Sequence, residues 1–169
     1  MTNVKESLNS RYRILMVDDE REICRVISTV LKKEGYRINK AYNGGQAIKK
    51  IKEKNYNLII LDYKLPDING IRVVEEVRPT NPTLKVIMIS AYGNPLTKSM
   101  AKNLGVYRFL EKPFDLNRLV KVVKDALAKN QGEVDRSSTP RRYGISVTPV
   151  VAKAESYNTD GTEFRCFRG

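Results

Sequence analysis

The 169-residue chain contains no histidine and no tryptophan, and it has only two cysteines, Cys24 and Cys166. Without histidine the chain has no Ser-His-Asp triad, no histidine-ligated zinc site and no histidine phosphoacceptor of its own. The two cysteines lie far apart and form no metal-binding or redox motif. No apolar run approaches the roughly 18 residues that a membrane span requires, and residues 1–13 lack the apolar core of a signal peptide. We therefore expect a cytoplasmic protein that does not bind membranes.

Positive charge, by contrast, is abundant: 31 Lys and Arg residues against 19 Asp and Glu residues give a net charge of +12. A basic chain is one sign of a nucleic-acid partner. Here, however, the lysines are scattered over predicted helix faces and are not interleaved with aromatic residues, which favours an ordinary solvated surface. A DNA-binding regulator that uses the basic surface and the C-terminal tail stays an alternative, although we see no dedicated DNA-binding domain.

Short apolar segments alternate with segments of helical periodicity between residues 12 and 130. The apolar segments, read as buried strands, are 12–17, 36–41, 58–61, 84–89 and 107–110. Helices are predicted to begin near residues 21, 43, 71, 94 and 115, with Asn43 and Asp115 as caps. The apolar face predicted for the first helix consists of Ile23, Val26, Ile27, Val30 and Leu31. This alternation predicts an α/β protein with a five-stranded parallel sheet, doubly wound and flavodoxin-like, covered by helices on both faces.

Polar and charged residues follow four of these strands. They are Asp18, Asp19 and Glu20 after the first strand, Asp62 after the third, Ser90 after the fourth and Lys112 after the fifth. Because the carboxyl ends of parallel strands meet at one edge of a sheet, we expect these groups to lie together. Clustered carboxylates repel one another unless a cation neutralises them, and an all-oxygen ligand set suits Mg²⁺. An aspartate beside Mg²⁺, a lysine and a hydroxyl is a plausible phosphoryl acceptor.

Each of these residues also has a simpler interpretation. Asp62 suits a turn, and Asp18 and Asp19 suit the positive end of the first helix dipole. Ser90 is compatible with an ordinary strand end, and Lys112 with a solvent-exposed position. The coincidence of all of them at the ends of successive strands favours the functional interpretation.

Two other folds place phosphate chemistry at strand ends. Haloacid-dehalogenase-like phosphatases carry a second acid two residues after the nucleophilic aspartate, where this chain has Lys64. A flavodoxin-like mononucleotide binder needs a loop that cradles phosphate after the first strand, whereas the acidic 18–20 stretch repels phosphate. Local electrostatics therefore disfavour both.

Four stretches together resemble the receiver domain of two-component response regulators over residues 12–130. They are LMVDDE, LDYKLPDINGI, VIMISAYG and RFLEKPF, at the residue spacing of that family. The resemblance implies that Asp62 is the phosphorylated aspartate and that Asp19 binds the metal directly. It implies that Asp18 holds the metal through water and that the backbone carbonyl of Lys64 completes the protein ligands.

The same resemblance implies the remaining roles. Ser90 matches the hydroxyl residue that moves onto the phosphoryl group, and Lys112 matches the lysine that pairs with this group. Phe109 matches the aromatic residue whose rotamer couples to the hydroxyl, whereas Tyr107 lies at the start of the strand and does not match it.

A receiver accepts a phosphoryl group from a partner phosphohistidine in a Mg²⁺-dependent reaction. The implied partners are a histidine kinase or a histidine phosphotransfer protein, and a downstream phosphotransfer or effector protein. The chain would be a signalling phosphoacceptor rather than an enzyme that turns over other substrates. A pseudo-receiver that binds partners without phosphorylation is the main alternative.

The lifetime of the phosphoryl group depends on residues that control water near Asp62. Lys64 and Tyr92 occupy those flanking positions, and neither is a carboxylate or an amide that would position water. In this respect the chain is similar to the sporulation phosphorelay intermediate, a single-domain receiver, which predicts a long-lived phosphoaspartate suited to a relay.

Composition changes after Asn130. We predict an N-terminal lead over 1–11, the receiver domain over 12–130, a linker over 131–142, and a C-terminal extension over 143–169. The extension suits either a hairpin or a disordered segment.

Overall fold

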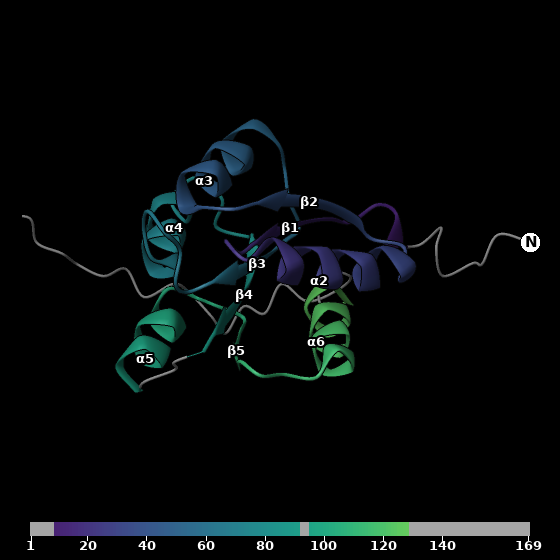
Figure 1. Ribbon diagram of the computed structural model, residues 1–169. Helices are drawn as coiled ribbons and strands as arrows, with labels where there is room; N and C mark the ends of the chain where they lie inside the picture. Colours follow the sequence, from purple (N-terminus) through teal and green to yellow (C-terminus); the bar gives the residue numbers. More distant parts are fainter. Residues whose placement is uncertain (1–8, 92–94, 129–169) are drawn as a thin grey trace, which may run out of the picture. The chain divides into compact units, whose positions relative to one another are not determined.

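The computed structural model describes residues 9–91 and 95–128 (Figure 1). The strands are β1 (Arg13–Val17), β2 (Arg37–Ala41), β3 (Leu58–Asp62), β4 (Lys85–Ser90) and β5 (Arg108–Glu111). The helices are α2 (Arg21–Lys33), α3 (Gly44–Glu53), α4 (Gly70–Val77), α5 (Pro95–Asn103) and α6 (Leu116–Ala128). Each predicted strand is present, and none of its bounds differs from the prediction by more than one residue.

All strand pairs are parallel, in the spatial order β2-β1-β3-β4-β5. The register pairs Val17 with Leu61, Asp62 with Ile89, and Ser90 with Glu111. The carboxyl ends of β1, β3, β4 and β5 therefore reach the same edge of the sheet. The predicted five-stranded, doubly wound fold is confirmed.

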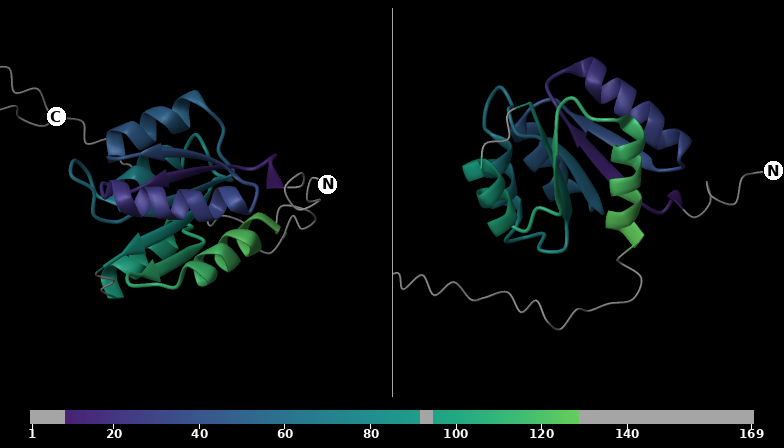
Figure 2. Two further views of the ribbon diagram at one scale, coloured as in Figure 1. Left: turned by 45° about the vertical axis from the view of Figure 1, so that its right-hand side comes forward. Right: turned by 90° about the horizontal axis from the view of Figure 1, so that it is seen from below.

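Helices cover both faces of the sheet, as the two views in Figure 2 show. On one face, α2 and α6 pack on a core that includes Ile14, Met16 and Ile60; on the other, α3, α4 and α5 pack on a core that includes Leu15 and Ile59. Side chains alternate between the faces along a strand. The central strands are consequently buried on both sides, which explains their continuous apolar sequences.

One apolar position of α2 was predicted wrongly. Ile27 and Leu31 are buried and Ile23 and Val30 pack partly against the core, but Val26 is 45% exposed. Val26 lies at the margin of the helix's apolar stripe, and none of the elements within residues 9–91 and 95–128 covers that margin. It lines a surface groove instead.

The predicted caps are present at two helices. The Asn43 side chain accepts a hydrogen bond from the N–H of Gln46, and Asp115 accepts from the N–H groups of Asn117 and Arg118. The residue before α2 is Glu20, whose side chain makes no capping hydrogen bond. Asp18 Oδ1 accepts a hydrogen bond from the N–H of Glu20 at 2.9 Å, one residue before α2 begins.

Several predictions lie outside the described residues: most of the lead over 1–11, the linker over 131–142 and the extension over 143–169. The proposed domain boundaries stay predictions. Among residues 9–91 and 95–128, no helix combines the length and the apolar character that a bilayer span needs.

Candidate functional site

Side chains from the ends of four strands surround one pocket at the carboxyl edge of the sheet. Asp62 and Ser90 are the last residues of β3 and β4, Asp18 and Asp19 follow β1, and Lys112 follows β5. The pocket has a volume of about 430 Å³, and its lining includes Asp19, Glu20, Asp62, Lys64, Ser90 and Lys112. Residues that are 94 positions apart in sequence thus meet because the parallel topology brings their strand ends together.

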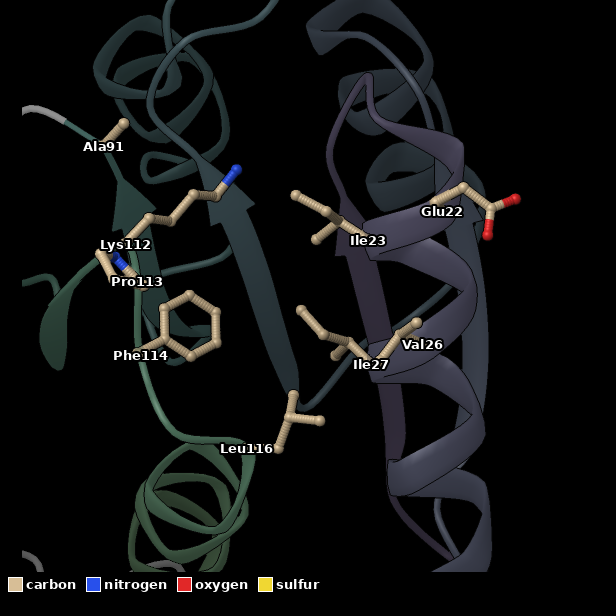
Figure 3. A pocket seen from close by; sticks show the side chains of 9 residues that line it. All are labelled: Glu22, Ile23, Val26, Ile27, Ala91, Lys112, Pro113, Phe114 and Leu116. Atoms are coloured by element: carbon tan, nitrogen blue, oxygen red, sulfur yellow. The ribbon is translucent and has the colours of Figure 1, made fainter.

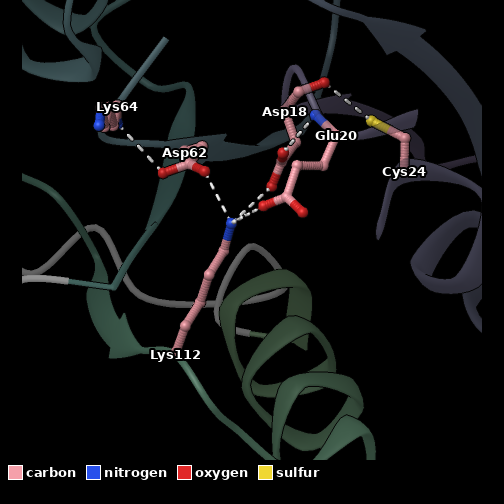
Figure 4. A network of polar contacts seen from close by, with 6 residues as sticks. All are labelled: Asp18, Glu20, Cys24, Asp62, Lys64 and Lys112. Atoms are coloured by element: carbon pink, nitrogen blue, oxygen red, sulfur yellow. Dashed lines mark hydrogen bonds and ion pairs between the residues drawn. The ribbon is translucent and has the colours of Figure 1, made fainter. Parts of the chain in front are cut away.

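The ammonium group of Lys112 lies between carboxylates (Figure 4). Its Nζ donates to Asp62 Oδ2 at 2.7 Å and to Asp18 Oδ2 at 2.9 Å, and it lies 3.7 Å from Glu20 Oε1. One cation is therefore shared among three anions, and the pocket retains negative charge.

The burial of these charged groups destabilises the folded state. The side chain of Asp18 is fully buried and that of Asp62 nearly so. Burial raises the pKa of Asp18 to about 6, although the hydrogen bond from Lys112 opposes the shift. Burial would lower the pKa of Lys112, but its hydrogen bonds to Asp62 and Asp18 outweigh this and raise it. Lys112 is thus a fixed positive charge, whereas burial disfavours the ionised form of Asp18.

A cation fits this ligand set. Asp18, Asp19 and Asp62 each offer a carboxylate oxygen, and these oxygens lie within 4.8 Å of one another. Hard oxygen ligands on a partly open pocket match the preference of Mg²⁺ for a few carboxylates plus waters. Asp18 is fully buried whereas Asp19 is exposed, so Asp19 is the more accessible of the two.

Asp62 is held by its own loop. Its Oδ1 accepts from the N–H of Lys64 at 3.1 Å, and the N–H of Tyr63 donates to the carbonyl of Ile89. Gly70, which is not among the predicted site residues, lets α4 begin against this strand end. A Cβ at Gly70 would lie 2.6 Å from the carbonyl oxygen of Asp62. In the sequence, the glycine that ends the DING stretch was the one feature that could have indicated this close approach of α4 to β3.

The residues assigned to switching and to phosphate lifetime have different placements. Phe109 is half-buried and packs on the α3–α4–α5 side, whereas Tyr107 packs on the opposite side of the sheet. The Lys64 residue lines the pocket and its side chain is exposed. Tyr92 lies outside the described residues. The roles given to Phe109, Lys64 and Tyr92 stay predictions.

An apolar groove adjoins the acidic pocket (Figure 3). Phe114 and Leu116 face Ile23 and Ile27 of α2 across it, and Pro113 and Val26 also line it. Its volume is about 590 Å³, and Ala91 and Lys112 line both the groove and the acidic pocket. An apolar surface therefore continues directly into the charged site.

In a comparison with protein families, the family model described as the response regulator receiver domain matches residues 14–124 of this chain. Among curated proteins, the regulatory protein VanRc of Enterococcus gallinarum is 34% identical over 150 residues, which cover 88% of this chain and 59% of VanRc. The transcriptional regulatory protein ZraR of Klebsiella oxytoca is 34% identical over 115 residues, 68% of this chain and 26% of ZraR. The chain thus spans less than two thirds of these relatives.

Solved receiver structures agree. The response regulator TrrA of Thermotoga maritima, solved in complex with Mg²⁺ and BeF, is 35% identical with a TM-score of 0.63; the match covers 69% of this chain and 99% of TrrA. A CheY-like receiver domain of Methanospirillum hungatei is 30% identical with a TM-score of 0.68, covering 70% and 94% of the two chains.

Proposed function

Because the chain belongs to the response regulator receiver family, we propose that it accepts a phosphoryl group on Asp62 from a partner phosphohistidine. The reaction depends on Mg²⁺ and serves two-component or phosphorelay signal transduction. The observation that carries the proposal is the meeting of Asp62, Lys112 and the Asp18–Asp19 pair at one pocket.

The chemistry follows from the charges in the pocket. A carboxylate oxygen of Asp62 attacks phosphorus, and the bond from phosphorus to the partner's imidazole nitrogen breaks with its electrons left on that nitrogen. Lys112 balances the negative charge of the phosphoryl oxygens, since it already contacts Asp62. Ser90 is buried beside the acceptor and supplies a hydroxyl. Mg²⁺, held by Asp18, Asp19, Asp62 and the Lys64 carbonyl, would neutralise the remaining charge.

The histidine must lie outside this chain, because its 169 residues contain none. The apolar groove beside the pocket supports such a partner: Val26 is exposed in it, and its lining reaches Lys112. A partner helix seated there would place its phosphohistidine next to Asp62. We also propose that the protein is cytoplasmic, where such a partner would reach it.

The test uses acetyl phosphate as a phosphoryl donor with the full chain. Wild type with Mg²⁺ should gain the mass of one phosphoryl group, and Asp62→Asn should gain none. Omission of Mg²⁺ should abolish the gain in wild type. Phosphorylation of Asp62→Asn at the wild-type level would refute the assignment of the acceptor. Mg²⁺ binding without any phosphorylation of wild type would instead favour the pseudo-receiver. DNA binding that weakens steeply with salt would favour the basic-surface alternative.

A further inference from the structure

The loop that follows Asp62 is fixed at its base and at its tip. At the base, the N–H of Gly70 donates to the carbonyl of Tyr63 at 2.7 Å, which closes the loop between β3 and α4. At the tip, both carboxylate oxygens of Asp67 accept hydrogen bonds from another element. Oδ1 accepts from the N–H of Gly44 and Oδ2 from the N–H of Gly45, each at 2.8 Å.

These two N–H groups belong to the first turn of α3, where no earlier residue of the helix can accept from them. Asp67 satisfies them from a loop more than 20 positions further along the chain. The negative carboxylate also faces the positive end of the α3 dipole. Burial alone would raise the pKa of Asp67, but the hydrogen bonds from Gly45 and Gly44 prevail and lower it. The contact therefore stabilises the ionised carboxylate.

Packing beside this contact is close. A Cβ at Gly44 would lie only 2.3 Å from Cγ1 of Ile68, so the glycine allows the loop tip to approach the helix. Leu65, between the base and the tip, is buried against the same core as α3. The loop is thus held on the body of the domain by hydrogen bonds and by side-chain packing.

Lys64 lies within this fixed loop, and its backbone carbonyl is the proposed metal ligand. A carbonyl, unlike a side chain, has no rotamer of its own and moves only with the loop. We propose that Asp67 is a positioning residue: by holding the loop tip on the first turn of α3, it fixes the Lys64 carbonyl beside Asp62 and sets the affinity for Mg²⁺. This rests on the proposed function. Asp67 is no ligand itself, since the carboxylate cluster among the described residues consists of Asp18, Asp19 and Asp62.

Asn43 offers a matched control. Its side chain caps the same helix by accepting from the N–H of Gln46 at 2.8 Å, but it does not reach the β3–α4 loop through that bond. Asn43→Ala and Asp67→Ala each remove side-chain acceptors from the start of α3, with comparable expected losses of stability. Only Asp67→Ala releases the loop that carries Lys64.

The test is calorimetric titration of the full chain with Mg²⁺, alongside the Mg²⁺ dependence of phosphorylation by acetyl phosphate. Asp67→Ala should raise the Mg²⁺ dissociation constant by about tenfold, as the loss of groups that orient metal ligands generally does. The phosphorylation rate at saturating Mg²⁺ should change much less. Asp67→Asn retains one acceptor oxygen and should give an intermediate rise of about threefold. Asn43→Ala should bind Mg²⁺ as wild type does.

An unchanged dissociation constant in Asp67→Ala would overturn the inference, and so would an equal rise in Asn43→Ala. Should Asp67→Ala fail to fold, Asp67→Asn decides in the same way, against the same control. The wild-type measurements test the proposed function, and the comparison of the variants with wild type tests the role of Asp67. If wild type neither binds Mg²⁺ nor accepts phosphate, the proposed function is wrong, and the inference that rests on it is wrong as well.

Discussion

Replacing Asp18 with asparagine should stabilise the metal-free protein. The side chain of Asp18 is fully buried, and burial raises its pKa from 3.8 to about 6, against the attraction of Lys112. Since one pKa unit corresponds to about 1.4 kcal/mol, ionised Asp18 destabilises the folded state at neutral pH by about 3 kcal/mol. An asparagine has a similar shape, carries no charge and retains an oxygen that can accept from the N–H of Glu20.

The gain in stability should be smaller than the about 3 kcal/mol that ionised Asp18 costs, because a buried amide also needs hydrogen-bond partners. We expect Asp18→Asn to raise the free energy of unfolding by about 1–2 kcal/mol, equivalent to an increase in Tm of several degrees in a domain of this size. Lys112 contacts Asp62 at 2.7 Å independently of Asp18, so we expect the variant to leave no buried cation unpaired.

The pH dependence has a definite sign. A carboxyl whose pKa is raised in the folded state destabilises that state fully above about pH 6, and the effect disappears as the pH falls toward 3.8. The difference between Asp18→Asn and wild type should therefore be largest at pH 7–8 and shrink toward pH 4. Mg²⁺ should reduce the difference at neutral pH, because it stabilises wild type more than the variant.

Urea unfolding followed by far-UV circular dichroism, in EDTA and in Mg²⁺, measures these differences; the absence of tryptophan makes circular dichroism the better signal. A variant that is less stable than wild type in EDTA at pH 7.5 would refute the reasoning. It would mean that the Lys112–Asp18 contact contributes more than the burial of Asp18 costs.

Two further predictions concern the phosphorylated protein and the domain boundary. Lys64→Asn combined with Tyr92→Glu should shorten the lifetime of the phosphoaspartate by about tenfold, equivalent to about 1.4 kcal/mol of barrier, because the double variant lacks the two side chains that shield the phosphoryl group from water. Equal or slower loss of phosphate from the variant in Mg²⁺ buffer would contradict the relay hypothesis. A chain that ends at Asn130, two residues after α6, should fold and accept phosphate as the full chain does, measured by circular dichroism and mass spectrometry. Precipitation of the shortened chain would show that the tail belongs to the domain.

Much of the fold was predictable because each signal is local. The parallel sheet follows from apolar strands between amphipathic helices, and the meeting of Asp62, Ser90 and Lys112 follows from that topology. The exposure of Val26 was not predictable in the same way. Helical periodicity identifies an apolar stripe, but the width of the stripe that neighbours cover depends on how α2 and the β5–α6 loop are spaced.

The internal order of the site depends on geometry that the sequence does not carry. Asp18 and Asp19 are adjacent in sequence and chemically identical, yet one is fully buried against Lys112 and the other is exposed at the pocket. The direction of the chain as it leaves β1 decides which carboxylate turns inward. Asp67 shows the same limit: its motif marks a turn, but its contact with Gly44 and Gly45 exists only because α3 and the β3–α4 loop pack side by side. Residue types at strand ends thus indicate the chemistry of the site, whereas the Mg²⁺ affinity that we propose depends on contacts between elements that only the folded chain brings together.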